Sequence, residues 1–258
     1  MRNNSSSLRR ALTLLDLIAA TARRDQGANL GELAAGIEST KSTVLRLLAP
    51  LVEAQLVRQD TDGTYRMGMG ILGLAGAYLA DLDIRTAAQP VLRELADATG
   101  QTAHLLVYSE GRVTYVDKVT GNSPIQMASR IGDTGTAYST ASGKAMLAFL
   151  GEEEVRNVVA LGMPAKTPAT ITDAQRLRDH LAVVRERGYA YDDLENEDGI
   201  RCVAAPVFNH TGAVACAVSV SGPAEAVAAN RQKYTDLVVE GAQRISAQLG
   251  HRGGDRNP

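Results

Sequence analysis

The chain has 258 residues, of which 45% are hydrophobic and 22% charged, so its composition argues against disorder and is typical of a globular protein. The net charge of −2 argues against a strongly basic nucleic-acid domain, although residues 1–70 carry a net charge of +2 and the remainder −4. The two cysteines form no CxxC pair and join no Cys/His cluster, so no metal site is expected. The longest apolar runs are far shorter than a membrane span and no signal-peptide core is visible, which predicts a cytoplasmic protein without a membrane partner.

The first predicted elements are three helices. Apolar residues recur at helical spacing over Leu8–Ala22. A second helix follows Asn29, because Asn29 and Glu32 have the spacing of an N-terminal capping box. Thr40 can cap a third helix. The polar face at the start of that third helix consists of Lys41, Ser42, Thr43 and Arg46.

A β-hairpin is predicted behind the third helix. Val57 and Tyr65 flank Asp60-Thr61-Asp62-Gly63, in which Asp-Gly is a strong hairpin signal. Helices followed by a hairpin are typical of a winged helix-turn-helix, which inserts a helix into the DNA major groove. Residues 1–70 are therefore predicted to form a mainly α DNA-binding domain. Its candidate DNA contacts are Lys41, Ser42, Thr43, Arg46, Arg58 and Arg66.

The alternative for these residues is a purely structural unit, since a Ser-Thr pair at a helix start is commonly a cap. The small positive charge of residues 1–70 would bind phosphate weakly, which predicts that two copies act together on double-stranded DNA. Pro50 lies inside the third helix and removes a backbone hydrogen bond, so a bend or an early end is expected there.

A glycine pattern lies after the hairpin. Gly68, Gly70 and Gly73 match the dinucleotide-binding GxGxxG, but the next element along the chain is a second helix instead of a parallel strand. The βαβ unit that such a site requires is therefore missing, and no cofactor is expected.

Residues 71–83 are predicted to form a linker helix. It is apolar over a wide arc, which favours packing against a second copy of the chain; packing within the chain is the alternative. The next helix is expected to begin or kink at Pro90 and to end at Gly100.

The remaining pattern alternates strands with helices and predicts an α+β domain over residues 84–258. Hairpins are expected at residues 104–108 with 113–119 and at 203–208 with 214–220, and a short strand at 125–128. Four helices are expected, at 142–150, 152–161, 173–187 and 230–249.

One spaced pattern in this region is specific. Residues 188–209 read Gly188-x3-Asp192-x2-Glu195-x6-Cys202-Val203-Ala204-x2-Val207-Phe208-Asn209. This resembles the signature of the IclR family of bacterial transcriptional regulators. Three further stretches agree with that family, namely Lys41-Ser42-Thr43-Val44-x-Arg46-Leu47-Leu48, Ala141-Ser142-Gly143-Lys144-Ala145 and Ser219-Val220-Ser221-Gly222-Pro223. The resemblance covers residues 8 to 249.

The resemblance implies a multi-domain protein with an N-terminal winged helix-turn-helix, a dimerising linker helix and a C-terminal GAF-like effector-binding domain. It implies a DNA-binding transcriptional regulator, with repression favoured, that is a homodimer or dimer of dimers on operator DNA. The effector is expected to be a small organic or aromatic acid. The positions that match the family's effector contacts are Met127, Ala141, Ser142, Asp192, Cys202, Ser219 and Ser221. The chain departs from the family at Pro50, and Ser142 occupies a variable position, so the shape of the effector does not carry over.

The chemistry of these positions suits a small anion. Unpaired amides at a helix start form an anion seat, and Ser219 and Ser221 alternate onto one face of a strand. Structural roles stay open, because Asp192 and Glu195 can cap or pair and Cys202 can be a small buried hydrophobe.

The rival class is an enzyme or a metabolite-binding protein without a DNA role, in which Cys202 or Ser142 acts in the C-terminal pocket. The histidines are His104, His180, His210 and His251. No Ser/Cys–His–Asp arrangement is visible among them, so the chain is not expected to be an enzyme.

Overall fold

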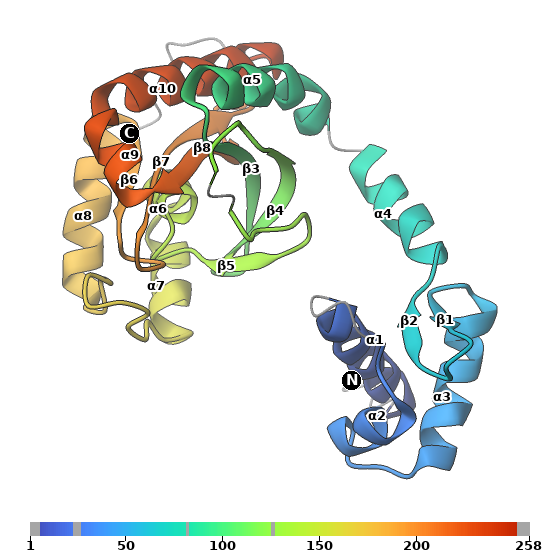
Figure 1. Cartoon of the computed structure of the whole chain (residues 1–258). Coiled ribbons are helices and arrows are strands. Elements are labelled where there is room, and N and C mark those ends of the chain that lie inside the picture. Colours follow the sequence, from blue (N-terminus) through green and yellow to red (C-terminus); the bar gives the residue numbers. More distant parts are fainter. Residues whose placement is uncertain (1–5, 23–26, 81–82, 125–126, 252–258) are drawn as a thin grey trace. The chain divides into compact units, whose positions relative to one another are not determined.

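The computed structural model describes residues 6–22, 27–80, 83–124 and 127–251 (Figure 1). Two compact units make up the chain, Met1–Asp81 and Leu82–Pro258. The boundary between them falls within the predicted linker, and the three-part division at residues 70 and 83 stays a prediction. Within the described ranges, no helix is both long and apolar enough to cross a membrane.

The first unit contains three helices, a two-stranded hairpin and a fourth helix. In chain order they are α1 (Ser6–Ala22), α2 (Leu30–Gly36), α3 (Lys41–Glu53), β1 (Val57–Gln59), β2 (Tyr65–Met67) and α4 (Gly70–Ala80). The core of the unit combines Leu14 and Ile18 of α1 with Leu33 of α2 and Leu48 of α3. Helices α1 to α3 thus surround one apolar centre, with the hairpin β1–β2 beside them, and this is the predicted winged helix-turn-helix layout.

The predicted helix caps are present. The Asn29 side chain accepts hydrogen bonds from the N–H groups of Gly31 and Glu32, and the Glu32 carboxylate accepts one from the Asn29 N–H, which completes a capping box. The Thr40 hydroxyl accepts from the Thr43 N–H at the start of α3. Both helices of the helix-turn-helix therefore begin where the sequence predicts.

Of the bend or early end expected at Pro50, the early end is wrong, because α3 continues to Glu53, and the bend stays a prediction. Pro50 has no N–H to donate, so the carbonyl of Arg46 loses its helical partner. Both residues are exposed, and water can take over that one bond. The Pro50 carbonyl itself accepts from the Ala54 N–H at 3.0 Å, so the last turn still closes.

The first two glycines of the GxGxxG match, Gly68 and Gly70, have a packing role, whereas a Cβ at Gly73 would meet no atom within 4 Å. A Cβ at Gly68 would lie 2.1 Å from the carbonyl oxygen of Gln55, and one at Gly70 would lie 2.6 Å from that of Ala54. The Gly68 N–H donates to the carbonyl of Leu56 at 2.9 Å. The chain after β2 therefore lies directly on the backbone at the end of α3, and only glycine fits there.

The second unit is a six-stranded antiparallel sheet with helices on both faces, in the strand order β5-β4-β3-β8-β7-β6. Its helices are α5 (Asp83–Thr99), α6 (Ala141–Leu150), α7 (Glu152–Ala160), α8 (Ala174–Arg187), α9 (Ala224–Ala229) and α10 (Arg231–Gln248). Its strands are β3 (Thr102–Ser109), β4 (Arg112–Val119), β5 (Thr134–Thr136), β6 (Ala190–Asp193), β7 (Ile200–Phe208) and β8 (Val214–Pro223). This is the predicted α+β architecture.

The two faces of the sheet bury two separate cores. Alternate residues of the central strands, such as Leu105 and Val218, pack with α5 and α10. Their neighbours Leu106 and Ala217 belong to the other core, with α6, α7 and α8. Figure 1 shows the same division, with α5 and α10 together over one side of the sheet. The face toward α6 is called the α6 face below.

Three local predictions in this unit need correction. Helix α5 begins at Asp83, seven residues before Pro90, and passes through that exposed proline. The strand expected at 125–128 is not formed at residues 127–128, and residues 125–126 lie outside the described ranges. Strands β5 and β6 were not predicted; with three and four residues they are too short to show a clear alternation.

Candidate DNA-binding and effector sites

The start of α3 presents the predicted polar face. Lys41, Ser42 and Arg46 are exposed, and Thr43 is half-buried. The Thr40 hydroxyl lies 3.0 Å from the hydroxyls of both Ser42 and Thr43. The two hydroxyls therefore take part in the helix cap, while the two cations extend from the surface.

The hairpin β1–β2, called the wing below, carries the other two predicted DNA contacts. Arg58 and Arg66 are directly opposite each other across the two strands. Both form ion pairs with Asp60: Arg58 through its Nη1 and Arg66 through its Nε at 2.8 Å. Two like charges that would repel each other thus share one carboxylate.

A row of polar side chains crosses the α6 face in the second unit. Antiparallel register places Asp192 on β6 opposite Cys202 on β7, and Cys202 opposite Ser221 on β8. The three side chains share one face because directly paired residues point to the same side of a sheet. The Ser221 hydroxyl lies 3.1 Å from the Cys202 sulfur. Three predicted effector contacts from three strands are thus neighbours.

A second row runs beside the first. Ser219 on β8 pairs with His104 on β3 and is almost fully buried, as is His104. The His104 Nε2 lies 2.8 Å from the Ser129 hydroxyl, and its ring meets that of Tyr115 edge-on with centroids 5.1 Å apart. The His104 Nδ1 is buried and has no hydrogen-bond partner among the described residues. Burial, with a smaller effect of Lys118, lowers the pKa of His104 to about 3, so the ring is neutral.

An ion pair lies under the first row. Lys144 of α6 has no exposed surface, and its ammonium group donates to a Glu195 carboxylate oxygen and, at 2.9 Å, to the Tyr191 carbonyl. The second Glu195 oxygen, Oε2, is buried without a partner in the described part of the chain. The pair connects α6 to the turn that follows β6.

Asp192 caps that same turn. One of its oxygens accepts from the Glu195 N–H at 2.7 Å and from the Asn196 N–H at 3.3 Å. Burial raises the pKa of Asp192 from its ordinary value of 3.8 to about 7, against the opposing effect of Lys144. Lys144 is already paired with Glu195, and with a pKa of about 7 the Asp192 carboxyl is only partly ionised near neutral pH.

The start of α6 forms the third side of this region. Thr140 caps the helix by accepting from the Gly143 N–H at 3.1 Å. The N–H groups of Ala141 and Ser142 find no acceptor among the described residues. The Ser139 hydroxyl, just before this helix, donates to the Asn196 side chain at 2.9 Å, so the start of α6 lies next to the turn that Asp192 caps.

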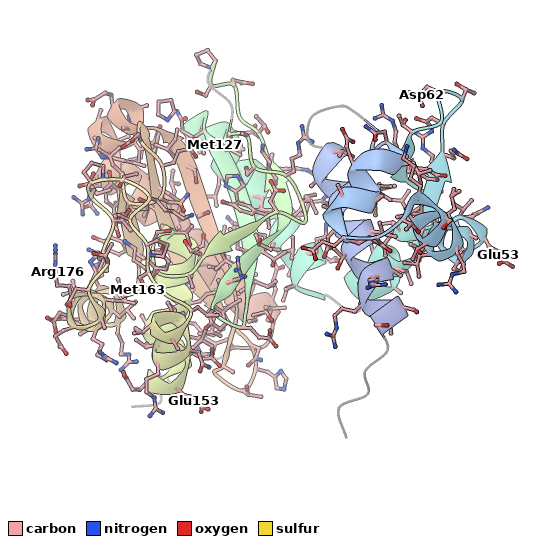
Figure 2. All side chains as sticks on the ribbon, turned by 90° about the horizontal axis from the view of Figure 1, so that it is seen from below. Glu53, Asp62, Met127, Glu153, Met163 and Arg176 are labelled. Carbon is pink, nitrogen blue, oxygen red and sulfur yellow. The ribbon has the colours of Figure 1, made fainter. Side chains whose placement is uncertain are left out.

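Met127 is held by its backbone. The Lys118 ammonium donates to the carbonyls of Met127 and Ser129 at 2.6 and 2.7 Å. Lys118 is opposite His104, so this segment passes on the His104 side of the face. Figure 2 labels Met127.

Cys202 does not have the properties of a nucleophile. Burial raises the pKa of its thiol to about 12, which keeps it protonated. Its sulfur is bonded to the Ser221 hydroxyl and the Val203 carbonyl, and no histidine base is among its hydrogen-bond partners in the described ranges. Ser142 likewise has no hydrogen bond to a histidine among the described residues.

The structure brings six of the predicted effector contacts into one region, and it adds residues that the sequence reasoning missed. These are His104, Tyr115, Ser129 and Lys144, the last of which pairs with Glu195. Lys144 could have been noticed, because it stands alone as a charge in the apolar run Ala141–Leu150. His104 gave no such signal, since its pairing with Ser219 depends on strand register.

A winged helix-turn-helix unit joined to an α+β unit with a buried polar face defines a DNA-binding transcriptional regulator with a sensory domain. Family models identify the family. The model described as IclR helix-turn-helix domain matches residues 7–61, and that described as bacterial transcriptional regulator IclR C-terminal matches residues 76–247. The chain belongs to the IclR family of bacterial transcriptional regulators.

Named relatives agree with this assignment. The regulator XynR of Escherichia coli is 35% identical over 216 residues, covering 83% of this chain and 85% of the relative. The regulator KdgR of the same organism is 34% identical over 223 residues, covering 85% of each. The crystal structure of Thermotoga maritima IclR is similar with a TM-score of 0.76 at 34% identity, covering 95% of this chain and 99% of that one.

Proposed function

We propose that the protein is a homodimeric repressor whose operator binding is controlled by a small organic acid bound on the α6 face. The observation that carries this proposal is the set of buried polar groups on that face, several of which have no partner among the described residues. A buried polar group without a partner is costly, and a bound ligand can supply the missing hydrogen bonds.

The acid would be seated at the start of α6. The N–H groups of Ala141 and Ser142 point toward the N-terminal end of the helix, where the helix dipole also favours negative charge. Ser219, Ser221 and Asp192 would bind the polar groups of the ligand from the sheet. Met127 would add an apolar wall, as the family resemblance implies.

His104 extends the proposed site beyond the family positions. Its neutral ring has one nitrogen engaged with Ser129, and the other has no partner among the described residues. Since the Ser129 hydroxyl can donate or accept, the second nitrogen, Nδ1, can act as acceptor or as donor by a change of tautomer. We infer that it contacts a hydroxyl or carbonyl group of the effector.

The DNA contacts are proposed to come from α3 and the wing. Ser42, Leu45 and Arg46 are at i, i+3 and i+4 and so share one exposed face of α3. Arg46 would bind a base edge or a phosphate, and Leu45, which is 48% exposed, is suited to a thymine methyl group. Lys41 with Arg58 and Arg66 would hold the phosphate backbone.

The dimer contact is proposed for α4. Leu72 and Leu74 on this helix are 65% and 62% exposed, and Met69 just before it is 74% exposed. Residues 72–77 are all exposed, which leaves the apolar helix without cover in a single chain. A second α4 would bury these side chains. Leu72→Glu should dissociate the dimer in sedimentation, whereas Leu161→Glu, at an equally exposed leucine of the second unit, should not.

Effector binding would change the equilibrium between two spacings of the DNA-binding units, through the helix at residues 71–82. To alter operator occupancy usefully, the effector must prefer one state by about 1–3 kcal/mol.

The proposal is tested by gel shift with the intergenic DNA upstream of the gene, with and without acetate, pyruvate and benzoate as probes. Ser219→Ala should abolish the response to the active acid and leave DNA binding intact. Cys216→Ala is the matched control, because Cys216 is buried on the same strand but faces α5 and α10. A normal response in the Ser219→Ala variant would place the effector elsewhere, and unshifted DNA would contradict operator binding at this fragment.

A further inference from the structure

The turn of the wing contains two acidic residues with different tasks. Asp62 closes the turn: its carboxylate accepts from the Thr64 N–H at 2.9 Å and from the Thr64 hydroxyl at 2.7 Å. These hydrogen bonds lower the pKa of Asp62. Figure 2 labels Asp62 at the tip of the hairpin.

The side chain of Asp60 has no part in closing the turn. Asp60 contributes to the turn only through its backbone, whose N–H donates to the Thr64 carbonyl at 2.8 Å and whose carbonyl accepts from the Gly63 N–H at 3.0 Å. Its carboxylate reaches back along the hairpin to Arg58 and Arg66, one guanidinium on each oxygen. The turn would therefore keep its hydrogen bonds if this carboxylate were removed.

The electrostatic effect of the arrangement follows from counting charges. Arg58 and Arg66 bring two positive charges to directly opposite positions, and Asp60 contacts both and offsets one of these charges. Asp62 at the tip also attracts Arg66 but forms no ion pair with it among the described residues. Each cation that is available to DNA phosphate releases counterions, and this attraction does not depend on sequence. A carboxylate in contact with both cations therefore weakens the part of DNA binding that carries no specificity.

We propose that Asp60 is a specificity-determining residue of the wing, because it restrains the sequence-independent attraction of Arg58 and Arg66 to DNA phosphate. The inference rests on the proposed contact of the wing with DNA. Asp60 would thus affect DNA binding although its negative charge prevents it from contacting the phosphate backbone itself.

The test measures the affinity of the full-length protein for a mixed-sequence duplex at several salt concentrations. Asp60→Asn should bind this duplex more tightly at low salt, and its plot of log affinity against log salt should be steeper by about one unit, the effect of one additional phosphate contact. That slope corresponds to an additional loss of about threefold between 50 and 200 mM salt. Asp60→Glu, which keeps the charge, should retain the wild-type slope.

Glu53→Gln is the control for loss of an acidic charge from the same unit. Glu53 is exposed at the end of α3 and is not paired with an arginine among the described residues; Figure 2 labels it away from the tip of the hairpin. This variant should leave the slope unchanged. An Asp60→Asn variant with a wild-type or shallower slope would overturn the inference, and so would an equal steepening by Glu53→Gln.

Two further variants separate this inference from the proposed function. Arg58→Ala and Arg66→Ala should each weaken binding to the duplex and flatten the slope. If neither does, the wing does not contact DNA and the proposed contact itself fails. If both weaken binding while Asp60→Asn changes nothing, the contact stands and only the restraining role of Asp60 is refuted.

Discussion

Replacing Asp192 with asparagine should stabilise the protein at neutral pH and not at acidic pH. Asp192 is 4% exposed, and burial raises the pKa of its carboxyl to about 7, whereas the unfolded chain restores the ordinary value of 3.8. A raised pKa means that the folded state holds the proton more tightly than the unfolded state. The carboxyl therefore costs no stability below about pH 4, costs more as the pH rises, and reaches its full cost above about pH 7.

The size of the effect follows from the shift. About three pKa units, at about 1.4 kcal/mol each, set an upper limit of roughly 4 kcal/mol for the gain in Asp192→Asn at pH 8. Asparagine keeps an oxygen that can accept from the Glu195 N–H, so the cap of the turn survives. The net shift already includes the opposing attraction of Lys144, so that attraction does not lower this limit further.

The assay is thermal unfolding of both proteins between pH 4 and pH 8. The melting temperature of Asp192→Asn should equal that of the wild type near pH 4 and exceed it increasingly up to pH 7, by about 2–4 °C for each kcal/mol. Asp193→Asn is the control, because the adjacent Asp193 is exposed and pairs with Arg201 at the surface. The reasoning is refuted if the difference in melting temperature between Asp192→Asn and the wild type does not change with pH, or if Asp192→Asn is less stable than the wild type at pH 8.

Three more variants test other parts of the structure. Lys144→Met leaves the buried Glu195 carboxylate without its partner and should lower the free energy of unfolding by about 3–5 kcal/mol. Adding Glu195→Gln should recover part of this free energy. If the two substitutions have additive effects in a double-mutant cycle measured by denaturation, the two residues are not coupled. Pro50→Ala restores an N–H for the Arg46 carbonyl and should stabilise the first unit by up to about 3 kcal/mol, which would raise its melting temperature. An unchanged melting temperature would show that the proline does not destabilise the helix at this position. Gly68→Ala places a Cβ 2.1 Å from a backbone carbonyl and should destabilise that unit; a neutral result in the same melting assay would mean that the backbone yields easily.

The sequence was most informative where structure is decided by neighbouring residues. The Asn29 capping box, the Thr40 cap and the turn at Asp60–Gly63 all depend on groups within four positions of each other. Such local hydrogen bonds leave a direct pattern in the chain, and all three features formed as predicted. The effect of Pro50 was misjudged because only one exposed carbonyl loses its partner in the last turns of the helix.

The grouping of polar side chains on the α6 face was only partly predictable. Asp192, Cys202, Ser219 and Ser221 were found through the family resemblance, and their roles as effector contacts stay predictions. His104 was missed because strand register brings it beside Ser219 from a distant part of the chain. The alternative role considered for Asp192 and Glu195, capping and pairing, is present in the structure.

The contact of Gly68 and Gly70 with the end of α3 has a consequence for signalling. Backbone meets backbone there, with the N–H groups of both glycines bonded to carbonyls of Leu56 and Gln55, so no side chain can act as a hinge between α3 and α4. A rotation of α4 would then turn α3, the helix proposed to contact DNA, together with it. Lengthening that junction by a single flexible residue should uncouple a motion of α4 from the orientation of α3, even with every DNA-contacting and ligand-contacting side chain left in place.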